Sequence, residues 1–287
     1  MLRSMHDLND YAIRATDGII GHVKDFYFDD EAWVIRYLVV DTGTWLSSRK
    51  VLISPIAIGH PDWTRKELPV AITKDQVKNS PAIDTDKPVS RQHEMRYLGY
   101  YGYPYYWGGV GLWGGGAFPG MALAGYGGVG SMPVGLPTEA QEANARAEDA
   151  RHKDDDPHLR SAHAVMSYHI EASDGEIGHV KGLLVDEQTW AIRYMVVNTS
   201  NWGVGNQVLV APQWIKHVSW SDATISVNLT QQAVKNSPLL DMATQLDRQQ
   251  EERIYKHYGR PGYWVAEGER EAQGHATKSA SAKETTS

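Results

Sequence analysis

The sequence predicts a mainly β protein: two small β-barrels in tandem, each followed by a short helical and aromatic extension, and joined by a Gly-rich linker. Two observations predict this class. The second half of the chain repeats the first, and each copy holds several short apolar segments separated by turn signals, as small closed sheets do. With 287 residues, 41% of them apolar, the chain can fill two cores of ordinary size.

The repeat relates residue i of the first half to residue i + 157 of the second. It holds without a gap from residue 2 to residue 107, with roughly two in five positions identical. An ungapped match of this length indicates a duplicated module of about 105 residues. We therefore expect a first module at residues 1–107, a linker at 108–158, a second module at 159–264 and a disordered tail at 265–287.

A hairpin is expected near the start of each module. Residues 20–28 follow an Asp-Gly turn signal and are apolar, and residues 33–40, rich in β-branched and aromatic side chains, come next after an acidic turn. The second copy repeats the first of these strands at 177–185. Further strand candidates lie at 51–53, 56–58 and 68–72 around a bend at Pro55.

Helices are expected after the last strand. Thr73-x-x-Gln76 matches a capping box that begins a short helix through Lys78, and residues 90–98 have helical composition. The barrels themselves should span residues 6–80 and 163–237. The alternating apolar positions predict the following core: Ile20, Val23, Phe26, Ile35, Tyr37, Val39, Leu52 and Ile58, with Ile177, Val180, Leu183, Ile192, Tyr194, Val196, Leu209 and Ile215.

The motif order resembles the PRC-barrel family. Gly18-x-Ile20-Gly21-x-Val23 is followed by an acidic turn and by Trp33-x-Ile35-Arg36-Tyr37-x-Val39-Val40, and the resemblance covers residues 6–75 and 163–232. This family includes the cytoplasmic domain of the photosynthetic reaction-centre H subunit and the C-terminal domain of a bacterial ribosome-maturation protein. The resemblance implies a bacterial protein-docking module. Likeness to the H subunit implies the alternative of a peripheral subunit of a photosynthetic or electron-transfer membrane complex, and with it a role in the light reaction of photosynthesis.

Composition argues against several classes of function. The net charge of −7 makes a phosphate-neutralising surface improbable, so we expect no nucleic-acid partner. The chain has no Cys, which removes disulfides and thiolate chemistry. Its start shows no signal peptide and no apolar stretch is long enough to span a bilayer, so a cytoplasmic protein is expected, membrane-associated only through a partner.

Repeated histidines are the candidates for a metal site. His22 matches His179, and His60 matches His217. No local spacing typical of metal ligands supports them, so half-exposed strand residues are the favoured interpretation, and a His-dependent metal- or ligand-binding protein is the second alternative. Asp-Gly turn chemistry accounts for the repeated carboxylates, and the catalytic motifs we sought are absent, so we expect no enzyme and no cofactor.

Positive charges in apolar strands are the candidates for partner binding. In the functional interpretation they form a cationic strip that recruits an acidic protein. In the structural interpretation they occupy outward-facing strand positions or form ion pairs with Asp29 and Asp186. The candidates are Lys24, Arg36, Arg49, Lys50, Lys181 and Arg193. From these observations we expect a non-enzymatic adaptor with a protein partner, in which the two barrels pair with each other or with a second chain.

The stretch from Tyr97 to Gly130, which includes the end of the first module and the start of the linker, interleaves aromatic residues with Gly. Stacking on bases or self-association is one interpretation. Because Tyr106 and Trp107 recur as Tyr263 and Trp264, we expect the aromatic part to pack on its own barrel and the Gly-rich remainder to be a flexible spacer.

Overall fold

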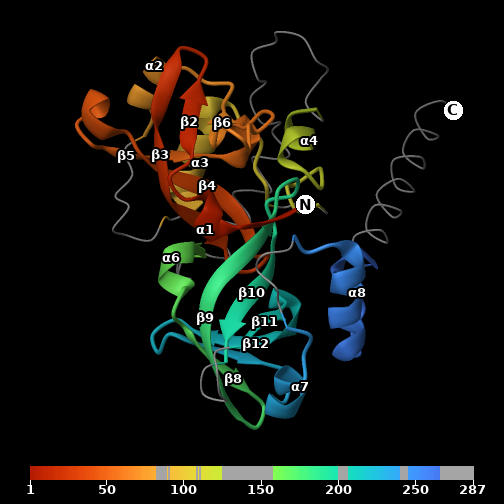
Figure 1. The fold of residues 1–287 in the computed structure, drawn as a ribbon. Coiled ribbons are helices and arrows are strands. Elements are labelled where there is room, and N and C mark those ends of the chain that lie inside the picture. Colours follow the sequence, from red (N-terminus) through yellow and green to blue (C-terminus); the bar gives the residue numbers. More distant parts are fainter. Residues whose placement is uncertain are drawn as a thin grey trace, which may run out of the picture.

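The computed structural model describes residues 1–81, 89, 91–107, 109, 111–124, 158–199, 206–239 and 245–265. Its described part is mainly β, with two sheets and a few helices, and the sheets form two lobes stacked end to end (Figure 1). The expected tail lies outside the described residues from residue 266 on. The Gly-rich stretch after Trp107 is described at 109 and 111–124, where Trp113 is buried and a short helix spans Pro119–Ala124. Among the residues described, no helix is long and apolar enough to cross a membrane.

The first sheet has the hydrogen-bonded order β5-β4-β3-β2-β6, with β7 paired to β3. Its pairs are antiparallel except β2 with β6, which are parallel. The strands are β2 (Ala12–Ala15), β3 (Gly18–Asp29), β4 (Val34–Asp41), β5 (Lys50–Ile53), β6 (Glu67–Pro69) and β7 (Leu159–Ser161). The predicted hairpin is confirmed as β3 and β4.

The second sheet repeats this arrangement, with the order β11-β10-β9-β8-β13-β12 and with β1 paired to β9. The strands are β1 (Leu2–Ser4), β8 (His169–Ala172), β9 (Gly175–Asp186), β10 (Ile192–Asn198), β11 (Gln207–Val210), β12 (Ile215–Ser219) and β13 (Thr224–Val227). In the described residues the hydrogen-bonded path of each sheet has two ends, so closure into a barrel stays a prediction.

Short helices connect and flank the strands. The α-helices are α1 (Met5–Leu8), α2 (Lys74–Lys78), α3 (Arg91–Tyr101), α4 (Pro119–Ala124), α6 (Ala162–Val165), α7 (Gln231–Lys235) and α8 (Arg248–His257), and the 3₁₀ helices are η1 (Gly43–Leu46), η2 (Pro55–Ala57) and η4 (Pro212–Trp214). The predicted capping box at Thr73 and Gln76 begins α2, and the helical segment expected at 90–98 is α3.

The strand predicted at 56–58 is wrong. Pro55 fixes a helical φ at the first turn, and the hydroxyl of Ser54 accepts a hydrogen bond from the N–H of Ile56, so this stretch begins as η2. Ile58 follows it and bridges to Val70. The predicted core is buried except at Ile58 and its mate Ile215, which are half-buried at the same place in the two copies.

The two copies exchange their first strands. β1 precedes the first sheet in sequence but pairs with β9 of the second, in the register Leu2 with Asp186 and Ser4 with Leu184. β7, its repeat, pairs with β3 of the first sheet, with Leu159 opposite Asp29. Replacing each residue of the β1–β9 pairing by its equivalent in the other copy gives the β7–β3 pairing. The exchange is therefore reciprocal and gives the pair of lobes an internal two-fold relation.

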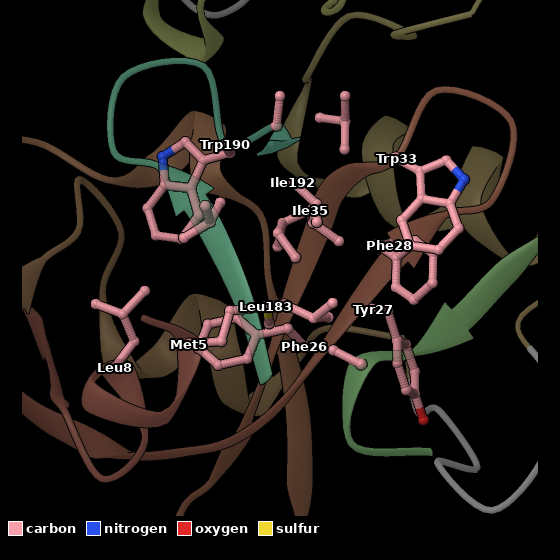
Figure 2. Close-up of a cluster of buried hydrophobic side chains, with 14 of the residues drawn as sticks. Met5, Leu8, Phe26, Tyr27, Phe28, Trp33, Ile35, Leu183, Trp190 and Ile192 are labelled. Carbon is pink, nitrogen blue, oxygen red and sulfur yellow. The ribbon is translucent and has the colours of Figure 1, made fainter. Parts of the chain in front are cut away.

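The core continues across the junction between the lobes. Figure 2 shows Ile35 and Ile192 close together, with Trp33 and Trp190 to either side. All four side chains belong to one buried hydrophobic cluster that includes both sheets. The two lobes therefore share one apolar interior.

A glycine that recurs in both copies permits the close approach of β9 to β10. Gly178 has φ +154°, and a Cβ there would lie 2.0 Å from the carbonyl oxygen of Asn198. Gly21, its mate, would collide in the same way with Asp41. This crowding explains the second glycine of the repeated Gly-x-Ile-Gly motif without any phosphate-binding role.

Candidate functional site

Arg36 lies at the centre of a buried polar network in the first lobe. Its guanidinium donates to Asp29 over 3.0 Å and to the carbonyl oxygen of Leu112 over 2.6 Å. It also lies 3.8 Å from the ring centre of Tyr106 and 4.9 Å from that of Trp113. Only 3% of Arg36 is exposed, so β4 directs this charge into the protein.

Asp29 is the acidic member of that network. Burial raises the pKa of its carboxyl, but the Arg36 charge and the backbone N–H groups of Ala32 and Glu31 outweigh burial and hold the pKa below its usual range. The carboxylate also accepts hydrogen bonds from those two N–H groups, which closes the turn between β3 and β4. Asp29 is thus a structural turn and ion-pair residue.

The second lobe repeats this network at Arg193. Its guanidinium lies 3.8 Å from Asp186, donates to the hydroxyl of Thr189 over 3.2 Å and covers the ring of Tyr263 at 4.0 Å. Of the two structural interpretations, the ion pairs with Asp29 and Asp186 are confirmed, and the outward-facing position is wrong for both arginines because each is buried.

A buried glutamate lies beside each arginine network. Glu94 of α3 accepts from the hydroxyls of Tyr37 (3.1 Å) and Tyr106 (2.6 Å), and lies 2.9 Å from the imidazole Nε2 of His158. The hydrogen bond from Tyr37 therefore links α3 to β4. Burial, reinforced by the charge of Glu94, raises the pKa of Tyr37 well above its ordinary value.

Glu251 of α8 is the equivalent group in the second lobe. It accepts from Tyr194 (2.9 Å) and Tyr263 (3.0 Å) and pairs with Arg248 at 3.1 Å. Burial raises the pKa of the Glu251 carboxyl despite the nearby Arg248 charge. In both lobes the glutamate ties the helix that follows the sheet to a tyrosine of that sheet, which is a structural task.

The predicted partner-binding residues divide into three groups by burial. Burial removes Arg36 and Arg193 from any exposed cationic strip. Lys24, Lys50 and Lys181 are exposed, with Lys24 paired to Asp10, whereas Arg49 is half-buried and donates to the carbonyl oxygens of Lys78 and Ser80.

The predicted metal candidates do not come together. His22, His60 and His217 are exposed and His179 is half-buried. Within the described residues, no group of three or more His, Asp or Glu side chains could hold a metal ion. A metal role for these histidines therefore gains no geometric support there.

Sequence reasoning missed the buried glutamates and His158. Glu94 and Glu251 recur at the repeat spacing of 157, which was a usable signal. Each also lies three residues after an arginine that recurs at the same spacing, Arg91 and Arg248. No local pattern marked His158, because its partner Glu94 lies in the first copy, whereas His158 directly precedes the second. Only the strand exchange brings the two together.

Comparison with known protein families gives a match in the first part of the chain. The model of the PRC-barrel domain family matches residues 2–76. These residues hold a PRC-barrel domain. An uncharacterized protein of Deinococcus radiodurans is 36% identical over 88 residues, covering 27% of this chain and 31% of the relative. The chain thus spans about a third of that relative's length, and the PRC-barrel domain covers only part of the structure described above.

Proposed function

We propose that the protein is a non-enzymatic adaptor built from two PRC-barrel modules in tandem, which together present a rigid, two-lobed surface to a protein partner. One observation carries the proposal: in both lobes the central arginine and glutamate networks are buried and bonded within the chain. Arg36 and Glu94 illustrate this in the first lobe, and Arg193 and Glu251 in the second.

The second module rests on the repeat and on the matching strand order. Residues 159–264 repeat residues 2–107 at a constant spacing, and β9, β10 and β11 pair as β3, β4 and β5 do. A crystal structure in which residues 159–234 superpose on 2–77 as closed barrels supports this assignment. Different strand orders in the two halves would contradict it.

The exposed lysines at equivalent positions of the two lobes are the proposed contacts. Lys24 and Lys181 occupy the same register of β3 and β9, so a symmetric or repeated acidic partner could engage both. Buried Arg36 and Arg193 are unsuitable for this test because reversing their charge would disrupt the folded core.

The experiment is a crosslinking pull-down from the native cells, read by mass spectrometry. The adaptor proposal predicts a dominant partner that is lost with Lys24→Glu plus Lys181→Glu and kept with the control Lys216→Glu, which alters an exposed lysine of β12. A dominant membrane complex would favour the peripheral-subunit alternative drawn from the H-subunit resemblance. Background alone would contradict both.

A further inference from the structure

The exchanged strand β7 enters the first lobe through His158, the residue directly before it. The carbonyl oxygen of His158 accepts a hydrogen bond of 2.9 Å from the backbone N–H of Asp30. Two residues further on, the guanidinium of Arg160 lies 2.8 Å from the Asp30 carboxylate. The start of β7 is therefore held to the turn between β3 and β4 by one backbone bond and one ion pair.

The imidazole of His158 adds a contact to a different element. Its Nε2 lies 2.9 Å from the carboxylate of Glu94 in α3 and 3.3 Å from the hydroxyl of Tyr106. The His158 side chain is 16% exposed, and the Glu94 side chain is fully buried. This contact joins β7, which opens the second copy, to the helix that closes the first sheet of the other copy.

The charge state of His158 decides how strong that contact is. A buried carboxylate is stabilised by hydrogen bonds and by positive charge close to it. The hydroxyls of Tyr37 and Tyr106 give Glu94 neutral hydrogen bonds, whereas a protonated His158 gives it a hydrogen bond and a charge. Because solvent screens charges little at a buried site, the imidazolium holds Glu94 more strongly than neutral imidazole does.

Other charged and titratable side chains surround this contact. They come from the turn after β3, from β4, from β7, from α3 and from the segment after α3: Asp30, Arg36, Tyr37, Arg160, Glu94 and Tyr106. Burial raises the pKa of the Asp30 carboxyl, with Arg160 partly offsetting it, and raises the pKa of Tyr37 well above its ordinary value. Imidazole is the only side-chain type in this set that ordinarily changes charge between about pH 5 and pH 8.

We propose that His158 makes the seating of β7 in the first lobe depend on pH. In mild acid the imidazolium binds Glu94 and holds the strand. The charged form gains this partner only while β7 is seated, so the stabilisation is present at low pH and is lost as the pH rises through the range in which imidazoles release their proton. Each opening of β7 uncovers the edge of β3 that it covers from Tyr27 to Asp29. This device is independent of the adaptor role.

Hydrogen exchange of the full chain at about pH 5.5 and about pH 8 measures how often β7 opens, once each rate is divided by the intrinsic exchange rate at that pH. The reporters are the backbone amides of β7 and that of Asp30, which donates to the carbonyl oxygen of His158. We expect their protection to fall at least about fivefold from the lower pH to the higher.

Three variants assign the effect to the His158–Glu94 contact. His158→Gln keeps a side-chain hydrogen-bond donor but no titratable charge, and its protection should change less than about twofold over the same range. Glu94→Gln removes the carboxylate and should flatten the profile in the same way, which keeps the test open should His158→Gln fail to fold. The matched control is His163→Gln in α6, an exposed histidine five residues further along, and it should keep the wild-type fall.

Three results would overturn the proposal. The first is wild-type protection of β7 that stays level or rises between the two pH values. The second is a fall that persists in a folded His158→Gln or Glu94→Gln variant. The third is a fall that disappears in His163→Gln, because an exposed histidine outside the Glu94 contact would then govern the pH response.

Discussion

The backbone N–H of Ile192 donates a hydrogen bond of 2.7 Å to the carbonyl oxygen of Trp33, in the other copy of the repeat. The reverse bond, from Ile35 to Trp190, is 2.8 Å long, and Val34 bridges to Ala191 between them. Together these bonds join the starts of β4 and β10 across the internal two-fold relation. The two copies are thus linked through their central hairpins as well as through their exchanged strands.

Ion pairs reinforce the exchange at both ends. Arg3 of β1 lies 2.9 Å from Glu187, and Arg160 of β7 lies 2.8 Å from Asp30, which is the same contact with the two copies interchanged. Each arginine also covers a tryptophan ring of its own copy, as Arg3 does Trp63 at 3.8 Å. Each exchanged strand is therefore held by contacts to both lobes.

Gly178→Ala should lower the free energy of unfolding by at least about 2 kcal/mol, because the new Cβ meets the Asn198 carbonyl at a φ that side chains rarely adopt. Gly182→Ala, in the same strand with open space at its Cβ, is the matched control and should change it by less than about 1 kcal/mol. Urea unfolding followed by circular dichroism measures both. Equal losses would show that crowding is not what selects Gly178.

Trp113→Ala should lower the free energy of unfolding by about 3–5 kcal/mol, since it empties a buried volume between the lobes. The indole N–H of Trp113 donates to the carbonyl oxygen of Thr189 over 2.8 Å, and its ring covers Arg36 of the first lobe. Leu112→Ala keeps the carbonyl oxygen that Arg36 uses and should cost less. Thermal unfolding of the two variants decides this, and equal melting temperatures would contradict a bridging role.

Stability should fall in acid partly through Asp29. Its pKa is lower in the folded chain than the ordinary value of 3.8, so the folded state holds fewer protons on it. The stability it contributes is present above that value and is lost as the pH falls through the lowered pKa. Asp29→Asn should therefore lose less stability than the wild type between about pH 5 and pH 2.5 in urea titrations, although it is less stable overall.

Asp30 supplies the control of opposite sign. Burial raises the pKa of its carboxyl, with Arg160 only partly offsetting that effect, so its protonation in acid favours the folded state. Asp30→Asn removes this effect and should steepen the loss of stability in acid. Parallel acid profiles for both variants and the wild type would show that neither carboxyl governs the acid response.

Local signals in the sequence were sufficient for the hairpin and the capped helix. The turn glycines and the β-branched runs predicted β3 and β4, and the Thr73 capping box predicted the start of α2. The exchange of β1 and β7 could not be predicted, because three-residue strands carry too little pattern to choose between a strand's own sheet and its duplicate. The sequence left two structural interpretations open for Arg36, an outward-facing strand position or an ion pair with Asp29. It could not choose between them because the burial of Arg36 depends on Tyr106 and Trp113, far along the chain.

Cysteine crosslinking tests the strand exchange directly, since the chain has no cysteine of its own. Ser4 pairs with Leu184 in the second copy, and the position equivalent to Leu184 in its own copy is Tyr27. Directly paired strand residues lie within disulfide reach, so the two double variants Ser4→Cys with Leu184→Cys and Ser4→Cys with Tyr27→Cys report on the two possible pairings. Reciprocal exchange predicts an intramolecular disulfide in the first variant, seen by intact mass and peptide mapping, and none in the second. A disulfide in the second variant alone would show that β1 pairs with its own copy and would contradict the exchange.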